Sequence, residues 1–115
     1  LRKASGEETA EKKHPNVVNN EELEYKLGSN IVVLDVREAA EYAFNHIPGS
    51  VSVPLGDLEN QMNEFNKDDE IYVVCRTGSR SDLAAQKLAE NGFNNVINVV
   101  PGMSQWSGKS QSLTK

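Results

Sequence analysis

Four short, largely apolar runs are spaced along the chain, each preceded by a polar residue and followed by a polar residue, proline or cysteine. They occupy residues 31–34, 51–53, 71–74 and 96–100. Continuous runs of this length are typical of strands that are buried on both faces of a parallel sheet. The pattern therefore predicts four strands, of which the second is brief because Pro48-Gly49 and Pro54 enclose it.

Between these runs, apolar residues recur at helical spacing. Asn19 and Glu22 have the pattern of a capping box at the start of a short helix, which Gly28 ends. Further helices are predicted at 38–45, 58–65 and 81–91, and a short helical piece follows Pro101-Gly102. The side chains expected to face inward are Leu23, Leu27, Ala39, Ala40, Ala43, Phe44, Leu58, Met62, Phe65, Ala84, Ala85, Leu88 and Ala89. Strands that alternate with helices predict an α/β fold, with helices on both faces of a parallel sheet.

The two ends of the chain lack this periodicity. Residues 1–15 are charged and almost free of apolar side chains, so we expect a disordered linker or tail. Residues 108–115 are rich in small and polar residues, and we expect a flexible tail. Residues 16–107 then form one domain, as the length of 115 residues also indicates. Because the chain begins with Leu1 and not with methionine, we expect it to be a piece of a longer protein.

The composition argues against several classes of function. With 12 basic and 17 acidic residues, the formal net charge is −5, which disfavours binding to nucleic acid or to an anionic membrane. No apolar run approaches the roughly 18 residues of a membrane-spanning helix, and no signal peptide is recognisable, so we expect a soluble, cytoplasmic domain. Two histidines and one cysteine offer no internal disulfide, no zinc ribbon and no all-protein metal cage, and we expect no cofactor.

The single cysteine, Cys75, lies between the buried run 71–74 and the helix predicted from residue 81. Ligands of open α/β sheets bind at the carboxyl ends of strands, and a loop that enters a helix there directs N–H groups and the helix dipole at an anion. A thiol in such a place has a lowered pKa and is reactive as the thiolate. Gly78 permits a tight bend, and Arg76 and Arg80 add positive charge. A lone cysteine after a strand is often only a small buried side chain, but these neighbours favour an activated thiolate.

Three kinds of thiol chemistry use a cysteine in a loop between a strand and a helix, and each requires different neighbouring residues. Thioredoxin-like exchange requires a second cysteine after two intervening residues, where this chain has Gly78. Thiol phosphatases place an arginine six residues after the cysteine and usually a histidine before it, whereas this chain has Ser81 and Val74 at those places. Sulfur transfer remains, in which a smaller loop holds the terminal sulfur of a cysteine persulfide.

Four motifs occur in a characteristic order. They are Leu34-Asp35-Val36-Arg37 with Glu41-Tyr42, His46-Ile47-Pro48-Gly49-Ser50, the six-residue loop from Cys75 to Arg80, and Gly102-Met103-Ser104-Gln105-Trp106. With these motifs, the chain from about Val17 to Trp106 resembles a single-domain rhodanese, a sulfurtransferase. Ser50 and Pro101 depart mildly from the family's usual alanine and glycine. The resemblance implies a five-stranded parallel sheet flanked by helices.

The resemblance also implies a role for each motif. Cys75 would attack a sulfane sulfur donor, either thiosulfate or a persulfide, and become a persulfide that a second thiol accepts. The loop residues Arg76, Thr77, Gly78, Ser79 and Arg80 would hold the negative sulfur through their N–H groups. Arg76 and Arg80 would attract the anionic donor, unless Arg80 only pairs with a carboxylate such as Asp82.

Roles outside the loop are less direct. Asp35 and Arg37 would brace the loop, with direct substrate contact as the alternative. His46 could be a general base, but its setting before Ile47-Pro48-Gly49 favours a structural role. Met103 and Trp106 are expected to cover the core.

A single cysteine also determines what kind of partner is needed. With no second thiol in the domain, the sulfur must pass to a thiol acceptor, which could be a low-molecular-weight thiol, a sulfur-carrier protein or a fused domain. The opening Leu1-Arg2-Lys3 and the charged segment after it resemble the junction in bacterial proteins that fuse a sulfur carrier to a C-terminal rhodanese. The alternatives are a non-catalytic rhodanese-like binding or regulatory module, which would typically lack the thiol, and, more remotely, a phosphatase or arsenate reductase.

Overall fold

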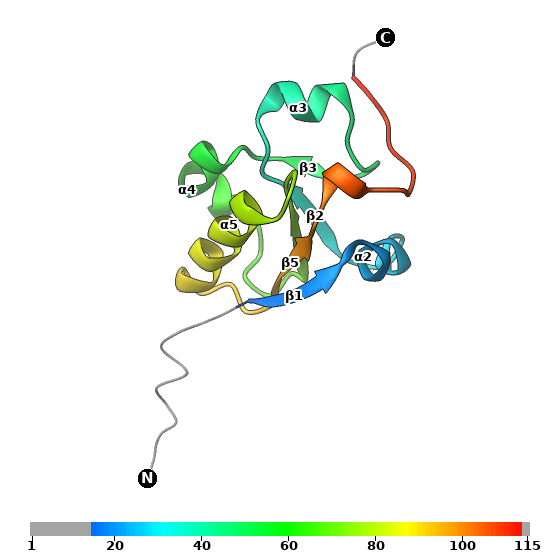
Figure 1. Ribbon diagram of the computed structural model, residues 1–115. Helices are drawn as coiled ribbons and strands as arrows, with labels where there is room; N and C mark the ends of the chain where they lie inside the picture. Colours follow the sequence, from blue (N-terminus) through cyan, green and yellow to red (C-terminus); the bar gives the residue numbers. More distant parts are fainter. Residues whose placement is uncertain (1–14, 114–115) are drawn as a thin grey trace.

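The computed structural model of the chain describes residues 15–113, so nearly all of the expected N-terminal linker lies outside it. Its strands form one parallel sheet in the order β1-β5-β4-β2-β3 (Figure 1). The strands are β1 (Asn16–Asn19), β2 (Val32–Asp35), β3 (Val51–Ser52), β4 (Ile71–Val74) and β5 (Val96–Val100). Because every pairing is parallel, the carboxyl ends of the strands share one edge of the sheet.

The four strands predicted from the apolar runs are confirmed as β2 to β5, with ends that shift by at most one residue. The sequence pattern does not predict β1, which is an edge strand that pairs only with β5. Val17 in this strand is 59% exposed, so β1 carries little of the apolar signal that marks the buried strands. The five-stranded α/β fold implied by the family resemblance is confirmed.

The helices are α2 (Asn20–Lys26), α3 (Ala39–Phe44), α4 (Leu58–Gln61) and α5 (Ser79–Glu90), with 3₁₀ turns η1 (Leu55–Asp57), η2 (Met62–Glu64) and η3 (Met103–Gln105). The predicted capping box of α2 is present, because Asn19 and Glu22 exchange hydrogen bonds of 2.8 and 2.9 Å. The helix predicted over 58–65 is divided into α4 and η2, and α5 begins two residues earlier than predicted.

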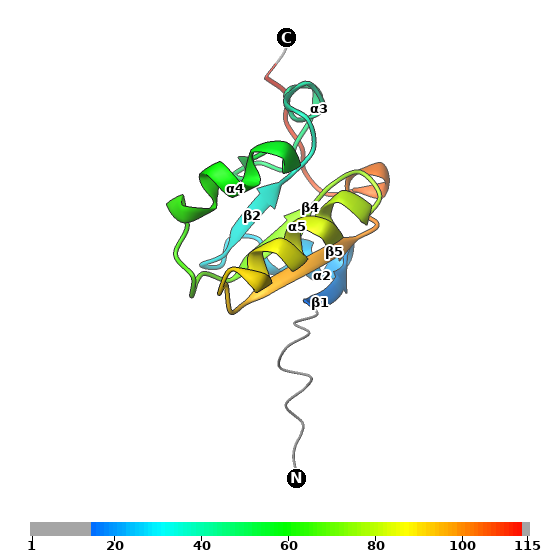
Figure 2. The same cartoon turned by 90° about the vertical axis from the view of Figure 1, so that its left-hand side faces the viewer.

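Two apolar layers enclose the sheet. One lies between the sheet and α4 and α5 and includes Leu34, Val73, Ala84 and Leu88; the other is built around Leu23 of α2. Figure 2 shows α5 in front of the sheet and α2 behind it. The predicted inward faces of α2 and α5 are confirmed, as is the expectation that Met103 and Trp106 cover the core, since both pack against the second layer.

The predicted inner face of α3 is wrong. None of the residues of α3 is buried, and Phe44 is 74% exposed. The helix lies beyond the carboxyl edge of the sheet (Figure 1), and none of its residues belongs to either apolar layer. Polar and ring contacts hold it instead: the Tyr42 hydroxyl donates to the Ser50 carbonyl at 2.6 Å, and the Tyr42 and His46 rings stack at 3.8 Å.

The last described residues lie beside the end of α3. His46 and Gln111 exchange backbone hydrogen bonds of 2.8 and 2.9 Å, and the Leu113 N–H donates to the Ala43 carbonyl at 2.8 Å. The sequence predicts a flexible tail from residue 108, because the residues there are small and polar. Backbone hydrogen bonds to residues far away in the chain, such as these, leave no mark on the composition. Among residues 15–113, no helix is long and apolar enough to cross a membrane.

Candidate active site

Cys75 follows β4, the central strand, at the carboxyl edge of the sheet, and its side chain is fully buried. After a short loop, the chain enters α5 at Ser79. Gly78, the residue before the helix, has a φ of +106°, and a Cβ atom there would lie 2.7 Å from Cγ1 of Val100. A side chain is therefore excluded both by the backbone conformation and by space, and Gly78 lets the chain bend over the sulfur.

Three groups at the start of α5 contact the sulfur of Cys75. The N–H groups of Gly78 and Ser81 donate to Sγ at 3.1 and 3.2 Å, and the Ser81 hydroxyl lies 3.3 Å from it. Burial is the largest influence on the thiol and raises its pKa. Hydrogen bonds from the Ser81 hydroxyl and from the N–H groups of Ser81, Gly78 and Thr77 together outweigh burial, so the pKa of Cys75 lies below its ordinary value. The site favours the thiolate.

Ser81 is a site residue that the sequence reasoning missed. That reasoning placed the sulfur's donors at residues 76–80, whereas Ser81 supplies two of the groups on Sγ and is itself fully buried. Its position six residues after the cysteine served only to exclude a phosphatase. The sequence does contain a signal for this role, because Ser81 is a hydroxyl residue in the first turn of the helix that follows the cysteine.

Two further N–H groups in the first turn of α5 have no hydrogen-bond partner among the described residues. Ser79 and Arg80 are the first residues of α5, so neither has a carbonyl one turn earlier to bond. Among the described residues, neither N–H makes a hydrogen bond. The amino end of α5 therefore has N–H groups that can bind an anionic atom.

The two loop arginines differ in their partners. Arg80 forms a two-point ion pair with Glu41 of α3, at 2.8 and 3.1 Å, and not with Asp82, which accepts from Gln86. The hydrogen bond from Arg80 is the main reason that the pKa of Glu41 falls to about 2, so the pair is fully charged at neutral pH. Arg76 is exposed and has no carboxylate partner among the described residues.

Asp35 and Arg37 form a buried ion pair at the end of β2. The Arg37 guanidinium donates to both Asp35 oxygens at 2.9–3.2 Å, and its Nη2 also donates to the Asn45 carbonyl at 2.6 Å. The pair thus anchors the end of α3 to the sheet. It makes no hydrogen bond to residues 75–80, so any bracing of the loop passes through α3 and its Glu41–Arg80 link.

His46 has a structural environment. It is 2% exposed, its Nδ1 bonds the Tyr42 carbonyl at 2.8 Å, and its Nε2 faces the Gln111 amide at 3.3 Å. A carbonyl only accepts, so Nδ1 carries the proton and Nε2 accepts from the amide. Both ring nitrogens are therefore occupied away from Cys75, in agreement with the structural role that the sequence favours.

The segment after β5 holds the other side of the Cys75 loop. The N–H groups of Met103 and Ser104 donate to the carbonyls of Cys75 and Arg76 at 2.8 and 2.9 Å. The buried Asn98 side chain adds a longer bond, of 3.4 Å, to the Gly78 carbonyl. The loop is therefore fixed from β5 and η3 as well as from α5.

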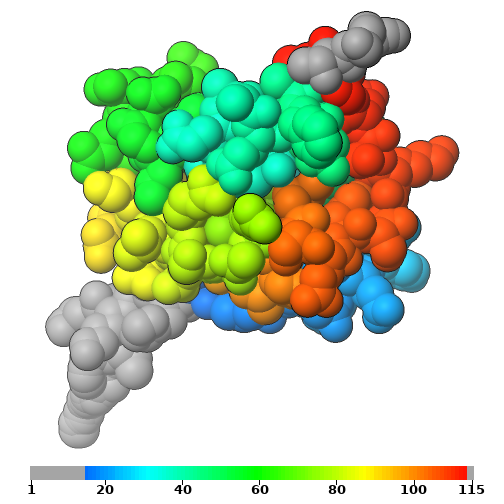
Figure 3. Space-filling view, turned by 45° about the horizontal axis from the view of Figure 1, so that its top comes forward, coloured from blue at the N-terminus to red at the C-terminus, as the bar shows by residue number. Residues whose placement is uncertain are grey.

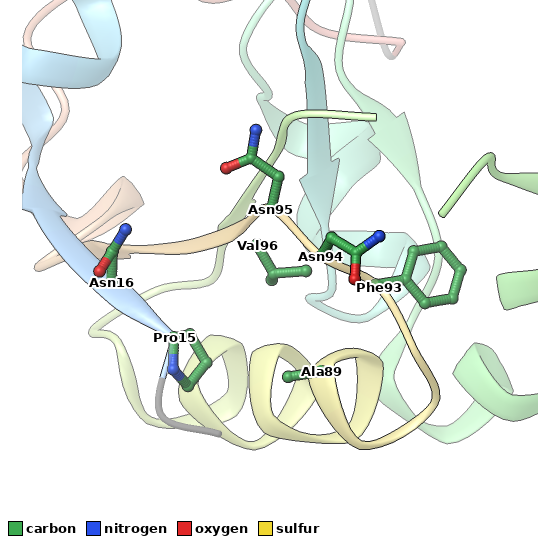
Figure 4. Close-up of a pocket in the computed structure, with 7 residues that line it drawn as sticks. All are labelled: Pro15, Asn16, Ala89, Phe93, Asn94, Asn95 and Val96. Atoms are coloured by element: carbon green, nitrogen blue, oxygen red, sulfur yellow. The ribbon is translucent and has the colours of Figure 1, made fainter. Parts of the chain in front are cut away.

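A groove of about 500 Å³ opens beside the loop, between α3 and η3. It is lined by Arg37, Ala40, Glu41, Phe44, Asn45, Arg76, Met103 and Ser104. In the space-filling view, α3, the loop after β4 and η3 adjoin on one face (Figure 3). A separate cavity of about 320 Å³ lies at the opposite edge of the sheet and is lined by Pro15, Asn16, Ala89, Phe93, Asn94, Asn95 and Val96 (Figure 4). It contains no ionisable side chain, and no cluster of three metal-ligating side chains occurs in residues 15–113.

The sequence of this chain is similar to those of several known proteins. The family model described as "Rhodanese-like domain" matches residues 19–109. The "Putative sulfur carrier protein YrkF" of Bacillus subtilis is 53% identical over 79 residues, which are 69% of this chain and 43% of that protein. The "Sulfurtransferase" of Allochromatium vinosum is 30% identical over 94 residues, which are 80% of this chain and 88% of that protein. This chain thus spans less than half the length of the first relative.

Solved structures agree with this comparison. A rhodanese-like domain protein from Staphylococcus aureus superposes with a TM-score of 0.75 at 31% identity, covering 82% of this chain and 93% of that one. A Bacillus anthracis structure titled "CoADR-RHD" matches with the same TM-score and identity but is covered over only 16% of its length. The domain therefore occurs both alone and as part of much longer chains.

Proposed function

The chain belongs to the family of rhodanese-like domains, and we propose that it is a sulfurtransferase that carries a sulfane sulfur on Cys75 and passes it to a thiol. The observation that carries the proposal is the set of donors around this one cysteine: the Ser81 hydroxyl and the N–H groups of Gly78 and Ser81 contact Sγ at the start of α5. The names of relatives, among them a sulfurtransferase and a sulfur carrier, support the same class of reaction.

In the first half-reaction, the Cys75 thiolate attacks the outer sulfur of thiosulfate or of a persulfide. A bond forms between Sγ and this sulfur, and the bond to the leaving group breaks, so that sulfite or a thiolate departs with the electron pair. The Ser81 hydroxyl and the Gly78 N–H lower the pKa of Cys75 and so increase the fraction of the reactive thiolate.

The product is a Cys75 persulfide whose outer sulfur carries the negative charge. The unpartnered N–H groups of Ser79 and Arg80, at the amino end of α5, would stabilise this sulfur, aided by the helix dipole. Exposed Arg76 would attract the anionic donor. In this proposal Arg80 does not attract the donor, because its charge is paired with Glu41. Its side chain instead holds α3 against the loop.

In the second half-reaction, an acceptor thiolate attacks the outer sulfur and Cys75 leaves as the thiolate. The chain has one cysteine, so the acceptor must be another molecule or another part of a longer protein. The name of the Bacillus subtilis relative supports a sulfur-carrier protein or domain as the acceptor. Because free reactive thiols are kept in reducing compartments, we propose that the protein acts in the cytoplasm.

A steady-state assay tests the proposal. The protein is supplied with thiosulfate and a thiol, and the release of sulfite is followed, with Cys75→Ser as the control. The wild type should turn over and the variant should not. A wild type that is inactive with thiosulfate and with a persulfide donor, or a variant that is equally active, contradicts the proposal.

A further inference from the structure

The groove beside the loop that holds Cys75 has apolar walls that are not needed for a small sulfur oxyanion. Ala40 and Phe44 of α3 line one side, and Met103 of η3 lines the other. Phe44 is 74% exposed although it is a large aromatic residue next to the site. Exposed aromatic side chains in a groove with a polar rim are typical of binding surfaces.

The charge in this groove is also unbalanced. Two arginines and Glu41 line it; Arg37 is bound to Asp35, and Glu41 is bound to Arg80. Arg76 is exposed and has no carboxylate partner among residues 15–113. The cation left for a ligand therefore lies in an apolar groove, which suits a molecule that has both a carboxylate and an apolar side chain.

The depth of the sulfur restricts the shape of the acceptor. Cys75 has an exposed fraction of 0%, so the flat surface of a folded protein could not bring a thiol to it. A protruding or extended segment could instead approach the loop through the groove, which Arg76, the residue after Cys75, lines. The groove volume of about 500 Å³ falls in the range of sites that hold small organic ligands, which is enough for one or two residues of such a segment.

We propose that the groove between α3 and η3 docks the sulfur acceptor, and that this acceptor is a peptide segment with a cysteine, an apolar side chain and a carboxylate. The inference rests on the proposed sulfurtransferase function. In the transfer, the peptide thiol loses its proton to solvent and its sulfur bonds to the outer sulfur of the persulfide. The bond from that sulfur to Cys75 breaks, and the electron pair returns to Cys75 as the thiolate, so no oxidant or reductant is consumed.

The two half-reactions can be measured separately in Phe44→Ser. Loading of Cys75 by thiosulfate is followed by intact mass, and the loaded protein is then discharged into one of three thiols. These are an N-acetylated Gly-Phe-Cys peptide with a free carboxylate, the same peptide amidated at its end, and 2-mercaptoethanol. Leu83→Ser is the matched control, because Leu83 is 56% exposed on α5 and lines no part of this groove.

In Phe44→Ser, discharge into the carboxylate peptide should slow by about fivefold to tenfold, which corresponds to the loss of part of one aromatic contact. Its loading by thiosulfate and its discharge into 2-mercaptoethanol should match the wild type, as should every rate of Leu83→Ser. With the wild type, the amidated peptide should react about threefold more slowly than the free carboxylate.

Equal discharge rates for Phe44→Ser and wild type with the carboxylate peptide would overturn the inference, even if loading proceeds normally. The same conclusion follows if the wild type does not prefer the peptide over 2-mercaptoethanol, or if Phe44→Ser slows loading as much as discharge. A wild type that acquires no sulfur at all contradicts the proposed function itself and the inference with it.

Discussion

Replacing Ser81 with alanine should raise the pKa of the Cys75 thiol. The variant loses the buried hydroxyl that lies 3.3 Å from Sγ but keeps the backbone N–H at 3.2 Å. A hydrogen bond to a charged group contributes about 1.5–3 kcal/mol, and about 1.4 kcal/mol is a factor of ten. At a pH below the pKa of Cys75, the thiolate fraction of Ser81→Ala should therefore be lower by about tenfold or more.

The reaction rate should change less than the thiolate fraction. A more basic thiolate is a better nucleophile, which offsets part of the loss, so loading at neutral pH should slow by about threefold to tenfold. The sign reverses at high pH: once both proteins are fully thiolate, Ser81→Ala should load as fast as the wild type or faster. A merely damaged site would be slower at every pH.

The assay is the ultraviolet absorbance of the thiolate as a function of pH, together with the loading rate over the same range. Since the chain has one cysteine, the thiolate signal belongs to Cys75 alone. Ser79→Ala is the matched control, because it removes an exposed hydroxyl from the same turn and keeps its N–H. A Ser81→Ala protein that is folded but titrates like the wild type would refute the reasoning.

Three further substitutions test how the site is held. Gly78→Ala should lower the free energy of unfolding by about 1–3 kcal/mol in a denaturant titration, because φ is +106° and the new Cβ would meet Val100; an unchanged midpoint would contradict this. Arg37→Gln should cost about 3–5 kcal/mol by the same measurement, since it leaves the Asp35 carboxylate buried without its partner, and a loss below about 1 kcal/mol would show that the pair is dispensable. Glu41→Gln should cost at most about 1 kcal/mol, because its ion pair is about one-third exposed. The stability that the Glu41 pair contributes should be fully present above the pKa of a glutamate in the unfolded chain and should disappear as the pH falls toward about 2. If the wild type and Glu41→Gln still differ in free energy of unfolding at a lower pH, the ion pair is not the source of that difference.

The parts of the fold that were predictable are those where burial imposes a local pattern. All four residues of β4 are buried, so its sequence is a continuous apolar run. One side of α5 is buried against the sheet, so its apolar residues recur at helical spacing. β1 is missing from the prediction because an edge strand with an exposed Val17 needs little apolar character. α3 was predicted to exist, but its alanines and Phe44 suggested an inner face that its place beyond the sheet does not provide.

The candidate site also has parts that the sequence predicts and parts that it does not. The position of Cys75 and the need for Gly78 follow from a strand, a short loop and a helix in succession. The contacts that complete the site join residues far apart in the chain, as in the ion pair between Glu41 and Arg80, which are 39 positions apart. Local sequence reasoning expected any carboxylate partner of Arg80 to be close in sequence, such as Asp82. Ser81 was missed for a different reason: its role depends on the direction in which one helical turn aims a hydroxyl.

The central claim is that Cys75 carries a transferable sulfur, and intact-mass spectrometry tests it most directly. After incubation with thiosulfate or a persulfide and removal of the donor, the wild type should gain the mass of one sulfur atom, and Cys75→Ser should gain none. Addition of a thiol should then return the wild type to its original mass, with the sulfur recovered on the thiol. A wild-type chain whose mass does not change with either donor, or whose added sulfur no thiol removes, would contradict the account.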